Sequence, residues 1–367
     1  MVTISFLGDI SLNDEYTRLF REGEKPFEAL AGSLADADLV AGNLECLAAG
    51  SDGENMQKKP RLKTDVETLG YLGHIKLGLA CLAHNHVYDN LKDGYQKTVS
   101  YLKQNGIHYL GAWPDEKSPG DPTTGESASD PGSILRLEIK GIRFAFFNYV
   151  AADTNPGLPE GAGIKLSLLD RQRVIQDLEE SREADFRILL LHWGGRYENS
   201  YFPGPGQVRM AKEFIRAGAD LIIGHHSHTY QPVMRYRGKT AAFSLGNFCF
   251  ADINSDGMVK EIRYRRWRES AVFKANFDRD GYRTQVIPFR LHGFRTVPAG
   301  GLRKRYAIRQ FIFGLMRITG IFWYIYYFGY RYLRPVAWEL RRRDPDRTLI
   351  QRLFGLKPER IGRMFKP

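Results

Sequence analysis

The chain has 367 residues, of which 43% are hydrophobic and 26% are charged. This composition allows at least one large buried core, and it excludes a disordered chain, a collagen-like chain and a small disulfide-stabilised scaffold. The net charge of +11 is unevenly distributed, because residues 301–367 contain 16 basic and 4 acidic residues whereas residues 1–300 contain 37 and 38. The excess of basic residues is therefore a property of the C-terminal segment.

The N-terminal residues predict a β-strand rather than an export signal. A short apolar run occupies residues 2–7, and no basic segment followed by a long apolar stretch accompanies it. We therefore expect no signal peptide at this end. The three cysteines form no CxxC pair, which is typical of a reducing compartment and disfavours a zinc-thiolate site.

Strand and helix patterns alternate through the first 110 residues. Short apolar runs predict strands, and a periodicity near 3.6 residues predicts helices. The expected strands cover residues 2–7, 38–41 and 76–82, and the expected helices cover residues 27–37, 66–72 and 96–104. This β-α-β-α order is typical of the α/β fold class.

The chain from residue 112 to residue 300 predicts a surface loop followed by a second sheet. Residues 112–133 are rich in Pro, Gly, Asp, Ser and Thr, which favours a loop. Beyond it we expect a hairpin at 134–149, helices at 168–181 and 207–217, strands at 186–191 and 220–223, and antiparallel strands over 230–290. A boundary at 298–301 is expected to separate a neutral domain, residues 1–298, from a basic and aromatic tail, residues 302–367.

Six of the nine histidines lie in three short stretches, each directly after an expected strand. They are His84 and His86, then His192, then His225, His226 and His228. In α/β sheets the carboxyl ends of the strands are where ligands converge. The side chains of Asp9, Asn43 and Glu45 follow the first two strands in the same way.

This clustering indicates a metal site. Neutral imidazoles mixed with carboxylate and amide oxygens suit divalent metals such as Zn, Mn or Fe. A lone histidine after a strand is more often a hydrogen-bonded core residue, and we interpret His74, His108 and His292 in that way. Five strand ends that all carry ligand-type side chains are hard to produce by chance, so we interpret the pattern as one constellation.

Six motifs, in their order and combination, resemble those of the CapA family of capsule or poly-γ-glutamate synthesis proteins. They are Phe6-Leu-Gly-Asp9, Gly42-Asn-Leu-Glu45, Asn85-His-x-x-Asp89, His192-Trp-Gly194, Gly224-x-His-x-His228 and Ser244-Leu-Gly-Asn-Phe248. That family is a branch of the calcineurin-like metallophosphatases, and the resemblance covers roughly residues 3–250. It implies a four-layer α/β/β/α sandwich with a metal site at its rim, which agrees with the order of strands and helices.

The resemblance also implies roles for individual residues. It suggests one or two divalent ions, Mn, Zn or Fe, held by Asp9, Glu45, Asn85, His192, His226 and His228. Such ions would lower the pKa of a bridging water and hold the oxygens of a displacement at phosphorus. His86 would donate a proton to the leaving group, and Asp89 would orient an imidazole. Further candidates for substrate binding or for support of the ligands are Asn43, His84, Arg196, His225 and Asn247.

Three positions depart from the family pattern. Ser11 stands where calcineurin-like phosphatases usually have the histidine of Asp-x-His, so one imidazole ligand is missing and one ion is expected to bind weakly. His84 replaces the first residue of an Asn-Asn-His motif. Arg196 stands where a Glu is expected after His-Trp-Gly, followed by Tyr197 and Glu198. Arg196 could bind a phosphate or a carboxylate in a bidentate manner, or it could be an ordinary exposed residue of a loop.

The tail predicts a helix that lies on a membrane surface. Residues 310–330 approach the ~20 residues that span a bilayer, but Arg317 would cost about 2.5–3.5 kcal/mol near the bilayer centre, so spanning is marginal. Five of these positions are Trp or Tyr, and basic clusters at 303–305 and 341–343 flank them. These features favour interfacial binding of residues 302–343 to an anionic membrane. The alternatives are a helix packed on the main domain and a subunit contact, and we expect no nucleic acid.

The sequence therefore predicts a metal-dependent enzyme similar to CapA, which acts in the biosynthesis of a capsule or another exopolymer, such as poly-γ-glutamate or a polysaccharide. Its reaction is expected to be hydrolytic, with a metal-activated water. The first alternative is a non-catalytic assembly subunit of a membrane polymer synthase, and the second is a soluble metal-dependent phosphodiesterase or nucleotidase. We expect a bacterial protein, peripheral or monotopic on the cytoplasmic side of the membrane, that contacts polymer-synthesis proteins.

Overall fold

A computed structural model describes residues 1–115, 132–255, 258–260 and 265–330 of the chain. The chain divides into two compact units, residues 1–309 and residues 310–367. The division lies inside a helix of the tail, so the first turns of that helix belong to the larger unit. The two units are described separately below.

Eight strands form the first sheet of the larger unit, in the order β18-β17-β16-β1-β2-β3-β4 with β13 beside β1. Five of them are parallel: β1 (Val2–Ile10), β2 (Leu39–Leu44), β3 (Leu79–Cys81), β4 (His108–Leu110) and β13 (Asn247–Cys249). Three antiparallel strands extend the sheet: β16 (Glu269–Asp278), β17 (Gly281–His292) and β18 (Arg295–Pro298). The carboxyl ends of the parallel strands therefore meet at one edge.

The second sheet has six strands in the order β11-β12-β10-β9-β7-β6. Its four inner strands are parallel: β7 (Ile142–Val150), β9 (Phe186–His192), β10 (Leu221–His225) and β12 (Lys239–Ala242). The antiparallel edge strands are β6 (Ile134–Ile139) and β11 (Val233–Tyr236). Two further strand pairs lie outside the sheets, β5 (Ala112–Pro114) with β8 (Ile164–Leu166) and β14 (Ile253–Ser255) with β15 (Met258–Lys260).

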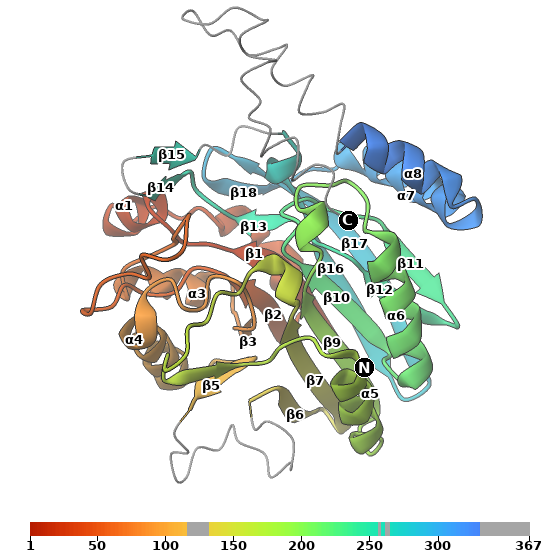
Figure 1. Ribbon diagram of the computed structural model, residues 1–367, viewed down its shortest axis with the longest axis horizontal. Helices are drawn as coiled ribbons and strands as arrows, with labels where there is room; N and C mark the ends of the chain where they lie inside the picture. The colour runs from red at the N-terminus through yellow and green to blue at the C-terminus, as the bar shows by residue number, and fades with distance from the viewer. Residues whose placement is uncertain (116–131, 256–257, 261–264, 331–367) are drawn as a thin grey trace, which may run out of the picture. The chain divides into compact units, whose positions relative to one another are not determined.

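The two sheets enclose a common apolar core, because side chains alternate between the faces of each strand. Phe6 and Phe273 of the first sheet share this core with Phe146 and Ile188 of the second. The opposite face of the first sheet packs on short helices: α1 (Glu15–Arg21), η1 (Glu28–Leu30), α2 (Ala31–Leu34), η2 (Glu67–Gly70), α3 (Tyr71–His74) and α4 (Leu91–Gln104). Figure 1 shows α5 (Arg171–Glu180) and α6 (Pro205–Ala217) over the second sheet. The expected four-layer α/β/β/α sandwich is confirmed.

Several predicted elements have different bounds in the structure. The helix expected at 27–37 is only η1 and α2, and α1 was not predicted. The helix expected at 96–104 begins at Leu91, because the buried side chain of Tyr95 continues its apolar face. The prediction of a loop at 112–133 is wrong at its start, because β5 pairs with β8 there and Trp113 is buried. Residues 116–131 of that loop lie outside the described part of the chain.

The tail contains two described helices, α7 (Leu302–Ile318) and α8 (Ile321–Phe328). Among the helices of the described residues, none combines the length and the apolar character that a membrane span requires. The tail beyond residue 330, including the basic cluster at 341–343, lies outside the described part of the chain.

Candidate metal centre

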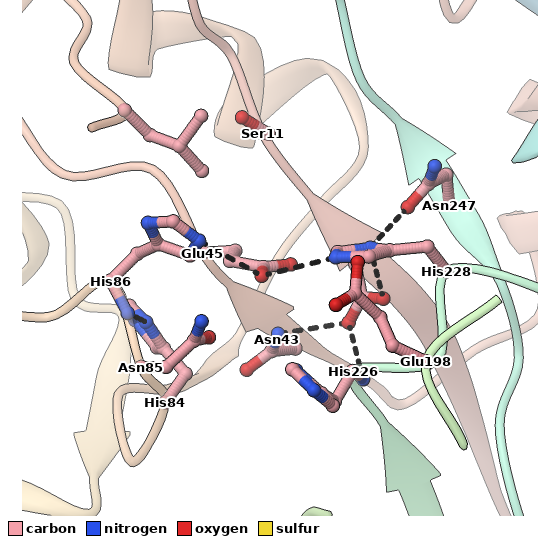
Figure 2. Close-up of polar contacts among 12 residues, drawn as sticks. Ser11, Asn43, Glu45, His84, Asn85, His86, Glu198, His226, His228 and Asn247 are labelled. Atoms are coloured by element: carbon pink, nitrogen blue, oxygen red, sulfur yellow. Dashed lines mark hydrogen bonds and ion pairs between the residues drawn. The ribbon is translucent and has the colours of Figure 1, made fainter. Parts of the chain in front are cut away.

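The pairing of the strands brings the predicted ligands to one edge of the two sheets. In the first sheet, Asp9 of β1 lies opposite Asn43 of β2 and Asn247 of β13. In the second sheet, His192 of β9 lies opposite His225 of β10. The loops after β2, β3 and β10 then supply the remaining predicted ligands (Figure 2).

Two glycines allow the strands to approach closely enough for this convergence. A Cβ atom on Gly8 would lie 1.9 Å from the carbonyl oxygen of Gly246, and the backbone N–H of Asp9 donates to that oxygen at 2.9 Å. A Cβ atom on Gly224 would lie 2.0 Å from the carbonyl oxygen of Phe243. The indole of Trp193 donates to the same oxygen at 3.1 Å. Glycine is therefore required beside the ligand positions because a neighbouring backbone occupies the space of a side chain.

Asp9, Glu45 and His228 form the first group of donors. One ligand-type atom of each lies within 4.8 Å of the other two. The imidazole Nδ1 of His228 is 3.2 Å from Asp9 Oδ2, and its Nε2 is 3.7 Å from Glu45 Oε1. Both carboxylates are fully buried, so this group concentrates negative charge away from water.

Asn85, His192 and His226 form the second group. The imidazole Nε2 of His192 is 2.8 Å from Asn85 Oδ1 and 3.0 Å from Nδ1 of His226. Asn43 connects the two groups, since its Nδ2 lies 2.9 Å from Asp9 Oδ1 and 3.3 Å from Nδ1 of His192. All six predicted ligands therefore lie in one continuous cluster.

The donors fit divalent cations. Both carboxylate oxygens of Glu45 are buried without a hydrogen-bond partner, and Oδ2 of Asp9 faces Nδ1 of His228 at 3.2 Å. A buried carboxylate without hydrogen bonds is strongly destabilised unless a cation or a proton neutralises it. Carboxylate, amide and imidazole donors from several strand ends are the set that Mn, Zn and Fe accept.

The charge states of the two groups differ. Burial raises the pKa of Glu45 to about 8. Burial opposes the charged form of His228, but Glu45 and Asp9 beside it raise its pKa to about 10. Burial lowers the pKa of His226 to about 4 and holds the pKa of His192 well below its usual value. The second group therefore presents neutral imidazoles, which is the form that binds metal ions.

His86 lies beside the first group and contacts Asp89. Its Nδ1 is 2.6 Å from Asp89 Oδ2, and its Nε2 is 3.9 Å from Glu45 Oε1. Asp89 Oδ2 also accepts from the backbone N–H of Leu62 at 2.8 Å, and its Oδ1 is 3.3 Å from the buried ammonium of Lys58. Burial lowers the pKa of His86, and Asp89 offsets part of this effect. Asp89 thus contacts the His86 ring at the position expected of a carboxylate that orients an imidazole.

The other predicted residues differ in their hydrogen-bond partners. Asn247 Oδ1 is 2.9 Å from Nδ1 of His228, and its Nδ2 donates to the Trp267 carbonyl at 3.1 Å, so Asn247 holds the histidine in place. His84 is buried with its ring centroid 6.0 Å from that of His192. His225 instead lies 3.2 Å from the Leu7 carbonyl oxygen and supports the backbone of β1.

A pocket of about 280 Å³ opens onto the cluster and contains residues that the sequence did not predict. Its polar lining includes Asn85, His86, His226 and His228. Arg196 is exposed on η4 (Gly195–Tyr197), and it is not among the residues that line the pocket. The residues missed by sequence reasoning come from loops and short 3-10 helices without a recognisable motif: Lys58, Lys59, Asp153, Asn155, Glu198, Asn199 and Trp267.

The chain matches proteins of bacterial capsule synthesis. A family model described as bacterial capsule synthesis protein PGA_cap matches residues 3–252. The capsule biosynthesis protein CapA of Bacillus anthracis is 27% identical over 259 residues, which is 68% of this chain and 60% of that protein. The PGA biosynthesis protein CapA of Bacillus subtilis strain 168 is 24% identical over 326 residues, covering 84% of this chain and 77% of that protein.

Solved structures match the chain over a similar extent at lower identity. A phosphatase from Mycoplasma pneumoniae is 14% identical with a TM-score of 0.47, covering 78% of this chain and 92% of that one.

Proposed function

This chain belongs to the bacterial capsule synthesis protein family PGA_cap, and from this premise we propose that it is a metal-dependent hydrolase of capsule or exopolymer biosynthesis. Its substrate would be a phosphorylated or otherwise anionic polymer precursor, such as one of poly-γ-glutamate or of a polysaccharide. The single observation that carries the proposal is the convergence of six ligand-type side chains, four of them buried, in one cluster onto which a pocket opens. A purely structural role would not require a buried carboxylate without hydrogen bonds at that place.

The residues of the cluster would have different roles, metal binding for six of them and proton donation for His86. Asp9, Glu45 and His228 would hold one divalent ion, and Asn85, His192 and His226 would hold a second. When bound, such ions supply a water of lowered pKa and positive charge beside the reacting phosphorus. His86, oriented by Asp89, lies at the pocket wall next to the cluster and would donate a proton to the leaving group.

One observation favours a second candidate, a non-catalytic assembly subunit of a polymer synthase. Position 11 supplies a hydroxyl rather than an imidazole, and the Ser11 hydroxyl donates to Asn13 Oδ1 at 2.7 Å. The first group therefore has one donor fewer than the family resemblance implies. A cluster that binds a cation only for stability would fit this candidate.

We also propose that the tail binds an anionic membrane surface on the cytoplasmic side. Of the thirteen large hydrophobic side chains that are exposed in the described part of the chain, ten lie between residues 308 and 328. Their apolar area, together with the basic residues at 303–305, suits an interfacial helix. The membrane would also bring the protein close to the enzymes that synthesise the polymer.

The test is hydrolysis by the purified full-length chain with each metal added in turn. Bis-p-nitrophenyl phosphate and poly-γ-glutamate would be offered as substrates, with the His192→Ala variant as the control for the cluster. The proposal expects cleavage of at least one substrate that depends on added metal and is lost in the variant. Metal binding without any cleavage would instead favour the assembly subunit.

A further inference from the structure

The first group of donors is incomplete for a divalent ion. Asp9, Glu45 and His228 offer three donors, whereas divalent cations in sites of mixed oxygen and nitrogen donors take about four to six ligands. Ser11 does not add one, because its hydroxyl is buried and bonded to Asn13. In Figure 2 it lies apart from the carboxylates.

Glu198 is a further carboxylate that lines the pocket beside the first group. It follows η4 and lines the pocket together with His226 and His228. Figure 2 shows its side chain directed toward His228. Its carboxylate interacts electrostatically with His226, His228 and Glu45, which agrees with a position close to the first group.

The loop holds the Glu198 side chain in this orientation. The side-chain amide of Asn199 donates to Glu198 Oε1 at 3.1 Å. The indole N–H of Trp267 in turn donates to Asn199 Oδ1. The backbone N–H of Asn199 donates to the Ser227 carbonyl at 2.8 Å, which ties the loop to the segment that carries His226 and His228. Glu198 is therefore positioned by the same backbone that positions two predicted ligands.

We propose that Glu198 is a ligand of the divalent cation held by Asp9, Glu45 and His228, and that it supplies the donor that Ser11 does not. This inference rests on the proposed function, since it assumes that the cluster binds a cation. It is carried independently by Glu45, whose two oxygens are fully buried, lack hydrogen bonds and lie beside His228. A third carboxylate would complete a site rich in oxygen donors, which favours Mn²⁺ over softer ions.

Asp153 provides a matched control. It is an exposed carboxylate that lines the same pocket, so Asp153→Asn removes the same charge from the same cavity. A general electrostatic effect on cation binding would weaken binding in both variants. A ligand role predicts an effect confined to Glu198.

The experiment is a calorimetric titration of the full-length chain with Mn²⁺. We expect Glu198→Gln and Glu198→Ala to weaken binding by about tenfold or more, since even the partners of ligands typically contribute that much, and Asp153→Asn to stay close to the wild type. Thermal unfolding of the metal-free proteins should be the same for all four, because Glu198 is only half-buried in a loop.

Three outcomes would overturn the inference, and they differ in what else they affect. Equal affinities in the wild type and in both Glu198 variants would remove Glu198 as a ligand and leave the proposed function intact. Equal weakening in the Asp153 variant would reduce the effect to general electrostatics. A wild-type chain that binds no Mn²⁺, Zn²⁺ or Fe²⁺ would overturn the proposed metal chemistry together with this inference.

Discussion

At the scale of single residues, the cluster separates groups that can hold a cation from a group that can move a proton. His228 lies between two carboxylates, at 3.2 Å from Asp9 and 3.7 Å from Glu45. His86 instead pairs with Asp89 at 2.6 Å and approaches Glu45 only to 3.9 Å. Removal of His86 and removal of His228 are therefore expected to have different effects on turnover and on bound metal.

We predict that His86→Ala lowers turnover by about 10²–10⁴ and retains bound metal, because it removes a proton donor and no ligand. His228→Ala should lose metal as well as turnover. Metal content by mass spectrometry and initial rates on the same samples measure both effects. If the two variants lose metal equally, His86 is a ligand and its proposed role is wrong.

The pKa values of the first group predict a pH dependence of metal binding. Burial raises the pKa of Glu45 to about 8, and the carboxylates raise that of His228 to about 10 despite its burial. This pair thus holds at least one proton at neutral pH, which a cation must displace. Affinity for Mn²⁺ should therefore rise as the pH increases from about 6 to about 9, with protons released on binding. Calorimetry in buffers of different ionisation enthalpy measures this release, and a pH-independent affinity without proton release would refute it.

At the scale of elements, the sequence predicts the strand ends better than the loops. The predicted ligands Asp9, His192 and His226 follow from apolar runs that end in polar residues, a pattern set by local burial. The true end of β1 at Ile10 does not follow in this way, because pairing of Asp9 with Asn247 of the distant β13 extends it. Glu198 was not predicted as a site residue, because its orientation depends on Asn199, which Trp267 and Ser227 hold from far along the chain.

The contact between β1 and the turn before β13 gives a prediction at this scale. Gly8→Ala would place a Cβ atom 1.9 Å from the Gly246 carbonyl oxygen, so the backbone must move. We expect a loss of about 1–3 kcal/mol in the free energy of unfolding, and weaker metal binding because Asp9 moves with the strand. Gly32→Ala is the control, since no atom lies within 4 Å of its added Cβ in a helix. Equal unfolding free energies for the two variants would contradict the close-approach argument.

At the scale of the whole molecule, the beginning of α7 belongs to the larger unit. Glu269 is buried and pairs with both Arg305 and Arg309. The ring of Tyr306 stacks on Tyr230 with 3.9 Å between centroids, and its hydroxyl donates to the Ser270 carbonyl at 3.0 Å. Charge composition alone places the boundary near residue 300, because it does not register these contacts.

Truncation should therefore depend on where the tail is cut. A chain that ends at Arg309 is expected to unfold at the temperature of the full chain. A chain that ends at Gly300 should lose about 3 kcal/mol of its free energy of unfolding, because the two ion pairs of Glu269 and the stacking of Tyr306 on Tyr230 are lost. Calorimetric unfolding of the three chains tests this expectation, and equal stability of the two truncated chains would contradict it.

The chain that ends at Arg309 also tests the proposed role of the tail. The full-length chain should bind vesicles that contain phosphatidylserine, and the chain ending at Arg309 should not. Salt should weaken this binding without abolishing it, since the exposed apolar side chains of 308–328 insert independently of ionic strength. Co-sedimentation measures the bound fraction. No binding by the full-length chain, or equal binding by both chains, would remove the membrane from the proposal.

The central claim is that the strand ends of the two sheets form a site for divalent cations, and metal stoichiometry tests it most directly. The full-length chain would be incubated with Mn²⁺, freed of excess by gel filtration and analysed by mass spectrometry, beside the variant Asp9→Asn, His192→Ala, which alters both groups of donors. The account predicts about one or two ions per wild-type chain and almost none in the variant. A wild-type chain that retains no more metal than the variant, with Mn²⁺, Zn²⁺ or Fe²⁺, would contradict it.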